Sequence, residues 1–104
     1  MEKEELLSVS NLNVKFELKN VDVNAVKGTS FSIKRGETLA IVGESGSGKS
    51  VTAMSIMRLN DFTKSAKTSG SIKLRQKDGS IIDLSVQTQT EMREKRGNEI
   101  AMIF

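Results

Sequence analysis

Residues 43–50, with the sequence GESGSGKS, constrain the fold more than any other stretch of this chain. They fit the pattern Gly-x-x-x-x-Gly-Lys-Ser, the Walker A motif or P-loop, in which glycines bring backbone amides close to phosphate oxygens. The motif requires a strand before it and a helix after it. Both are expected here, because residues 39–42 are continuously apolar and residues 49–59 form an apolar helical stretch with Ala53, Ile56 and Met57 on one stripe.

Each position of this loop has an expected role in holding a nucleotide. The helix N-terminus adds free N–H groups and partial positive charge at the same anion. The Lys49 side chain can reach the β- and γ-phosphates, and the Ser50 hydroxyl can ligate Mg²⁺, which prefers oxygen. The loop backbone would cradle the phosphates, with the Glu44 carboxylate turned to solvent. The expected loop residues are Gly43, Glu44, Ser45, Gly46, Ser47 and Gly48. The alternative is a flexible Gly/Ser loop without a ligand.

Before the loop, the pattern predicts two antiparallel strands. Leu12, Val14, Phe16 and Leu18 alternate with polar residues, which is typical of a half-buried strand. A second strand is expected over residues 25–33, and residues 34–37 should form a turn.

After the loop, the pattern predicts a hairpin, a helix and a further strand. Residues 60–69 are polar and expected to be a loop. Asp78 and Gly79 lie between two apolar runs within residues 71–84, which is a strong hairpin signal. Thr88 and Glu91 have capping-box spacing, and the helix that they open should end at Gly97. Residues 100–104 are apolar and predict a second core strand.

The composition excludes several kinds of chemistry. The 104 residues contain no Cys and no His, which excludes disulfides, thiolate or imidazole metal sites and a Ser-His-Asp triad. No apolar run approaches the length of a membrane helix. The net charge of +3 comes from basic residues scattered among acids, so we expect no nucleic-acid binding.

Beyond the loop, the chain resembles the ATP-binding subunits of ABC transporters, most closely those of oligopeptide and dipeptide importers. The resemblance runs from about Leu6 and is carried by residues 43–53, 91–93 and 96–104, with support from residues 12–16 and 31–37. It implies an α/β fold of the P-loop NTPase class, namely an antiparallel β-subdomain plus the start of a RecA-like core. The whole chain, 1–104, would be one partial nucleotide-binding domain.

The resemblance also implies individual roles. Phe16 matches the aromatic residue that stacks on adenine, although core packing explains it equally well. Val26 matches a wall of the same pocket, but a core valine is the simpler interpretation. Val51 would offer its backbone amide to the α-phosphate. The implied ligands are ATP and Mg²⁺, the latter at Ser50.

Several family motifs are not found in these residues. The resemblance would require a Gln directly after residues 100–104, a Walker B Asp with its catalytic Glu, a signature motif and a switch His. We therefore assign no catalytic residue and expect these residues to bind ATP without hydrolysing it, while the parent domain would be a transport-coupled ATPase.

Three functional hypotheses remain open at this point. The first is part of an importer ATPase for peptides or similar solutes, peripheral to the cytoplasmic face of the membrane. Its partners would be membrane subunits and a second ATPase subunit. The second is another P-loop protein, such as a nucleotide kinase or a non-transport ATPase. The third is a truncated product or a β-rich module without catalysis. Two core strands alone would leave exposed edges, which predicts marginal stability and aggregation.

Overall fold

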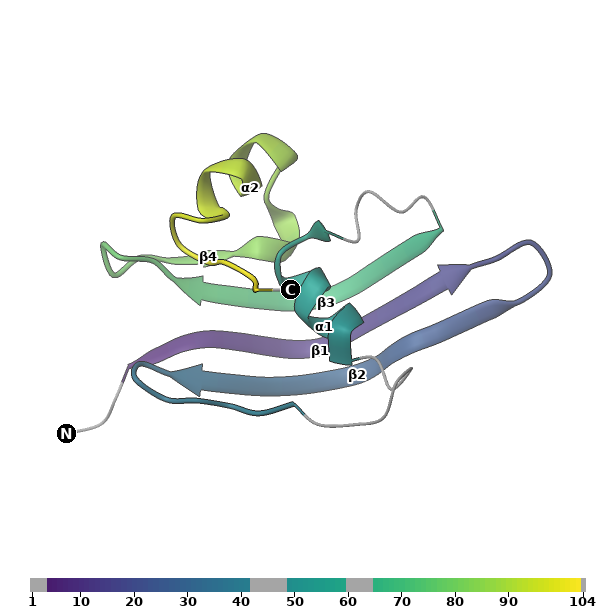
Figure 1. Ribbon diagram of the computed structural model, residues 1–104, viewed down its shortest axis with the longest axis horizontal. Helices are drawn as coiled ribbons and strands as arrows, with labels where there is room; N and C mark the ends of the chain where they lie inside the picture. The colour runs from purple at the N-terminus through teal and green to yellow at the C-terminus, as the bar shows by residue number, and fades with distance from the viewer. Residues whose placement is uncertain (1–3, 42–48, 60–64, 104) are drawn as a thin grey trace.

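The computed structural model describes residues 4–41, 49–59 and 65–103. These residues form one four-stranded antiparallel sheet with the strand order β2-β1-β3-β4. Helix α1 lies over one face of the sheet, and helix α2 lies beyond β4 (Figure 1). Within the described part of the chain, no helix is both long and apolar enough to cross a membrane.

The two strands predicted before the loop are confirmed as a long hairpin. Strand β1 covers Glu5–Glu17 and strand β2 covers Asp22–Lys34, thirteen residues each. The amide of Leu18 donates to the carbonyl of Val21 at 3.0 Å and closes the turn between them. At the far end of β2, the amide of Glu37 donates to the carbonyl of Lys34 at 3.0 Å, which confirms the turn predicted at residues 34–37.

The second hairpin is also confirmed, although one of its strands begins earlier than predicted. Strand β3 covers Ala66–Arg75 and strand β4 covers Ile81–Asp83. Gly79 has the positive φ of +90° that the turn requires. Residues 66–69 were predicted as a loop, and this is wrong, because they pair with the second half of β1. These residues (Ala-Lys-Thr-Ser) show no alternation of apolar and polar side chains, so their strand conformation depends on backbone pairing with β1.

A β-bulge at Asn11 explains why β1 does not follow one alternation throughout. Leu7 and Val9 are buried, and so are Leu12 and Val14, although the two pairs are out of step by one residue. Asn11 has a φ of +51°, and the pairing with both neighbouring strands shifts register beside it. The extra residue therefore keeps both apolar pairs on the same face of the sheet.

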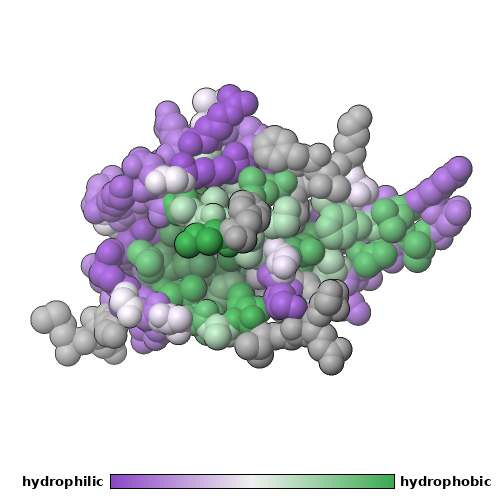
Figure 2. All heavy atoms as spheres, in the orientation of Figure 1, coloured by the Kyte–Doolittle hydropathy of each residue, from purple (hydrophilic) through white to green (hydrophobic). Residues whose placement is uncertain are grey.

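The buried core lies between this face of the sheet and the helical segments. Leu12, Ile72, Leu84 and Met92 are fully buried and come from two strands, the 3₁₀ turn η2 (Leu84–Val86) and α2. Figure 2 shows apolar side chains gathered over the middle of this face, with polar side chains over α2. The complete cluster also contains Leu7, Val9, Val14, Val26, Ile56 and Leu74.

Helix α1 covers Lys49–Ile56 and ends earlier than the predicted boundary near Leu59. Ile56 and the following Met57 are buried as predicted. Ala53, the third residue of the predicted stripe, is partly buried. Thr52 and Ser55 are buried instead, since they lie on the side of the helix that faces the sheet.

Helix α2 covers Gln89–Lys95 and confirms the predicted capping box. The Thr88 hydroxyl accepts from the Glu91 amide at 3.1 Å, and the Glu91 carboxylate accepts from the Thr88 amide at 2.9 Å. Gly97 follows the C-cap residue Arg96 with a φ of +80°, so the helix stops where the glycine predicts.

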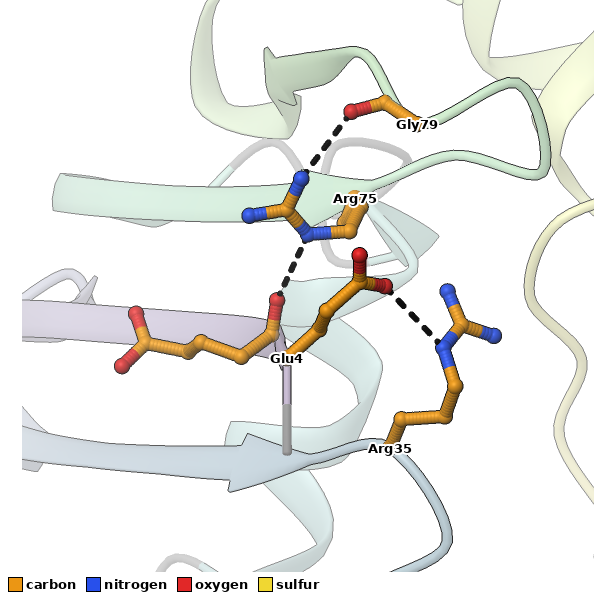
Figure 3. A network of polar contacts seen from close by, with 5 residues as sticks. Glu4, Arg35, Arg75 and Gly79 are labelled. Carbon is orange, nitrogen blue, oxygen red and sulfur yellow. Dashed lines mark hydrogen bonds and ion pairs between the residues drawn. The ribbon is translucent and has the colours of Figure 1, made fainter. Parts of the chain in front are cut away.

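Polar contacts join the strand ends at the edge where β1 begins (Figure 3). Arg75 donates from Nε to the carbonyl of Glu5 at 3.1 Å and from a terminal nitrogen to the carbonyl of Gly79 at 3.1 Å. Arg35 forms an ion pair with Glu4 at 3.2 Å. One arginine thus ties β1 to the β3–β4 turn, and the other joins exposed side chains.

The prediction of two parallel core strands, at residues 39–42 and 100–104, is wrong for the residues of these segments that the structure describes. Residues 39–41 are not a strand, and Leu39 and Ile41 are 41% and 45% exposed. Ile100 makes a single bridge to Arg96, while Ile103 is 98% exposed. A strand exists only where a neighbour satisfies its backbone, and no described strand pairs with either segment. The antiparallel part of the predicted α/β fold is present, whereas a parallel core sheet is not seen in the residues described.

Candidate functional site

The described part of the candidate site is the first turn of α1. Lys49, Ser50 and Val51 lie in α1, which agrees with the helix that the motif requires after the loop. The Lys49 side chain is partly buried and Ser50 is exposed. Val51 packs against the core cluster. The other predicted loop residues, Gly43, Glu44, Ser45, Gly46, Ser47 and Gly48, lie outside the described residues.

The electrostatics of this turn favour an anion. The first turn of α1 contains no acidic residue, and Lys49 is the one charged residue of the helix sequence KSVTAMSI. The first amides of any helix lack intrahelical acceptors and carry partial positive charge. The Lys49 ammonium therefore lies at the end of α1 that carries partial positive charge.

The other end of α1 is held by two arginines. Arg96 donates from Nε to the carbonyl of Met57 at 2.8 Å and from a terminal nitrogen to the carbonyl of Arg58 at 3.2 Å. Arg58 in turn donates to the carbonyls of Leu84 at 2.9 Å and Gln87 at 2.5 Å. Sequence reasoning did not assign Arg58 a role, because nothing in the local pattern shows which distant carbonyls its side chain reaches.

The two candidate adenine contacts lie on β1 and β2. Val26 is 5% exposed and belongs to the core cluster, which supports the packing interpretation for this residue. Phe16 lies near the end of β1, opposite Val23 on one side and Ala66 on the other. It is only partly buried and packs against the core, so an adenine contact by Phe16 stays a prediction.

The Asp83 carboxylate at the end of β4 accepts several hydrogen bonds. It accepts from the Ser85 amide at 2.9 Å, the Ile72 amide at 3.2 Å and the Ser71 hydroxyl at 3.0 Å. Burial alone would raise the pKa of this carboxyl, but the hydrogen bonds from Ser85, Ile72 and Ser71 outweigh it and hold the pKa below its ordinary value. The group therefore stabilises the turn after β4, and it is poorly suited to accept a proton from water.

No other acidic cluster suggests a metal centre. In residues 4–41, 49–59 and 65–103, no group of three or more Asp or Glu side chains could hold a metal ion. The Ser50 hydroxyl is a hard oxygen donor of the kind that Mg²⁺ prefers.

Comparison with known proteins finds one family and several relatives whose names agree with that family. Residues 26–104 match the family described as ABC transporter. The glutathione import ATP-binding protein GsiA of Salmonella typhimurium is 48% identical over 104 residues, which is 100% of this chain and 17% of that relative. The protein of the same name from Escherichia coli O157:H7 is 48% identical over 99 residues, which is 95% of this chain and 16% of that relative. The chain thus spans a small part of the length of the curated relatives that it matches.

Proposed function

Because this chain belongs to the ABC transporter family, we propose that it binds MgATP through residues 43–51. The observation that carries the proposal is that Lys49 and Ser50 lie in helix α1 (Lys49–Ile56), since the Gly-Lys-Ser pattern requires a helix at these residues. A phosphate at this position would meet the partial positive charge of the helix N-terminus and the Lys49 ammonium.

Each residue of the proposed site has a separate task. The backbone amides from Gly43 to Gly48 cradle the phosphates, and Val51 contributes its amide to the α-phosphate. Lys49 neutralises the β- and γ-phosphates as a point charge. Phe16 stacks on the adenine from the side of β1. Packing of the partly buried Val51 against the core supports this arrangement, since it holds this part of the helix to the sheet.

The Ser50 side chain fits a magnesium ligand. Its hydroxyl is a hard oxygen donor, it is exposed, and no acidic side chain of the first turn competes with it. Bound Mg²⁺ would neutralise phosphate charge. The chain's own contribution is to present the hydroxyl beside Lys49.

We propose that the whole protein uses ATP to power import of glutathione or related peptides, because the relatives named above carry glutathione import in their names. Its partners would be membrane subunits of the transporter and a second ATPase subunit, and its place would be the cytoplasmic face of the membrane. The residues that the family uses for hydrolysis are not in this sequence, so the function proposed for these residues is nucleotide binding.

A MgATP titration of the 104-residue chain tests the site directly. Saturable binding is expected, and Lys49→Ala should weaken it about 10- to 100-fold, since a hydrogen bond to a charged group contributes roughly 1.5–3 kcal/mol. Ser50→Ala should reduce the affinity for MgATP more than that for ATP in EDTA. Lys19→Ala removes the same charge from an exposed turn and is the matched control. Equal affinities for the Lys49→Ala and Lys19→Ala variants would refute the site.

A further inference from the structure

We propose that Arg96 is a positioning residue for the nucleotide, and that it acts by anchoring the C-terminal end of α1. This inference rests on the proposed function, because it concerns the helix whose first residues are Lys49 and Ser50. Arg96 lies at the C-cap of α2, far along the chain from that turn.

The geometry at this helix end is specific to arginine. Two nitrogens of the Arg96 guanidinium reach carbonyls that follow α1, those of Met57 at 2.8 Å and Arg58 at 3.2 Å. A terminal nitrogen also donates to the Gln89 side-chain oxygen at 3.1 Å, which orients the guanidinium plane. The last carbonyls of a helix have no intrahelical donors and carry partial negative charge, so a cation with several donors suits them. Lysine cannot reproduce this fork.

A second arginine strengthens the link in the opposite direction. Arg58 has a φ of +60°, so the chain leaves α1 abruptly at this residue. Its side chain donates to the carbonyls of Leu84 and Gln87, which lie in and after η2. The Arg58 side chain, just after α1, thus donates to backbone carbonyls in and after η2, and the Arg96 side chain, just after α2, donates to backbone carbonyls just after α1. We call these two residues, Arg58 and Arg96, the arginine clamp.

Such a short helix depends on its tertiary contacts. Helix α1 has eight residues, and isolated helices below roughly 12 residues are marginal in water. Its sheet-facing side buries Thr52, Ser55 and Ile56, and two of these three are polar. Hydrogen bonds at the end of the helix therefore add to the apolar contacts of Ile56 and Val51 that hold it against the core. The clamp fixes one end of a rigid element, and the position of that end determines where Lys49 lies at the other.

The clamp also predicts a reciprocal effect. If fixing α1 through Arg96 improves nucleotide binding, then nucleotide binding must stabilise the clamp by the same free energy. MgATP should therefore increase hydrogen-exchange protection of the Arg96 amide, which donates to the carbonyl of Met92 at 2.9 Å. General stabilisation by the ligand would raise the protection of the Val9 and Ile72 amides equally, so a positioning role requires a larger increase at Arg96 than at those two amides.

The test compares Arg96→Gln and Arg96→Lys with the matched control Arg93→Gln, at a temperature where circular dichroism shows each variant folded. Arg93 is exposed on the same helix, and no hydrogen bond from its side chain to another described residue is seen. We expect Arg96→Gln to weaken MgATP binding about 10-fold, to lower the exchange protection of α1 amides, and to leave the amides of Val9 and Ile72 unchanged. Arg96→Lys should be intermediate, and Arg93→Gln should match the wild type.

The outcomes separate this inference from the proposed function. Wild-type binding that depends on Lys49 but is unchanged in Arg96→Gln and Arg96→Lys would overturn the positioning role alone. Absence of Lys49-dependent binding in the wild type would overturn the proposed function and the positioning role with it. If Arg96→Gln does not fold, Arg96→Lys decides the question, because unchanged affinity and unchanged α1 protection in that variant contradict a role for the guanidinium fork.

Discussion

Gly70 lies so close to Asn11 that a Cβ atom added to the glycine would be 2.5 Å from the asparagine carbonyl oxygen. The contact joins β3 to the bulge of β1. Two hydrogen bonds join the same bulge to β2. The backbone amide of Asn11 donates to the Ser30 hydroxyl at 2.9 Å, and the Asn13 side-chain oxygen accepts from the backbone amide of Gly28 at 2.9 Å. Three strands therefore depend on the geometry of one bulge.

Gly70→Ala should destabilise the chain strongly. The new methyl group would meet backbone atoms, and the φ of +114° is itself unfavourable for alanine. We expect a loss of about 2 kcal/mol or more in the free energy of unfolding by urea. Gly36→Ala is the control, because Gly36 also has a positive φ but nothing lies near its added Cβ. A loss no larger at Gly70 than at Gly36 would show that the close approach is not a constraint.

Stability should fall in acid partly through Asp83. Its pKa is lowered in the folded state, so in acid the unfolded state binds the proton more readily. The stabilisation is therefore complete above the unfolded pKa of about 3.9 and is lost as the pH falls through the lower folded value. Asp83→Asn should be less stable at neutral pH by about 1–2 kcal/mol and should show a flatter pH profile below about pH 5. Glu94→Gln removes one carboxylate from an exposed position of α2 and is the control for the loss of a single charge. An unchanged slope in Asp83→Asn would contradict this assignment.

Thr88→Ala should weaken α2 by removing one half of the capping box. Loss of an N-cap hydroxyl costs about 1 kcal/mol of stability. The effect should be seen in urea unfolding and as faster hydrogen exchange of the Glu91 amide, whose acceptor is the Thr88 hydroxyl. Thr90→Ala removes the same hydroxyl from an exposed position within the helix and should change the stability by less than about 0.5 kcal/mol. Similar losses at both positions would argue against the cap.

The two arginines of Figure 3 should differ in their effect on stability. Arg75→Met keeps the apolar stem but removes the donors to the carbonyls of Glu5 and Gly79, which should cost about 1 kcal/mol. Arg35→Met removes an ion pair whose side chains are 55% and 58% exposed, so the change should be within about 0.5 kcal/mol. Urea unfolding of both variants checks the order, and a larger loss at Arg35 would reverse it.

Much of the β-sheet could be predicted from the sequence because its signals are local. The alternation at Leu12, Val14 and Phe16 predicted β1, and the Asp78–Gly79 pair predicted the second hairpin. The capping box at Thr88 and the glycine after α2 were also predictable, since each depends on neighbours within a few residues. For the candidate site, the sequence alone predicted a helix at Lys49 and the residues after it, and α1 covers them.

The remaining features depend on partners that lie far along the chain. Ala66 lies in a strand because its backbone pairs with that of Phe16. Leu39 is apolar but lies outside any strand, because no described strand pairs with its backbone. The same applies to the clamp, in which Arg96 reaches the carbonyl of Met57 only after the sheet and α2 have brought the two segments together. The sequence determined the turns, the caps and the phosphate-binding pattern, since these form within a few residues. The tertiary structure decided which segments found hydrogen-bonding partners, because a backbone group or a guanidinium is satisfied only by what the fold places beside it.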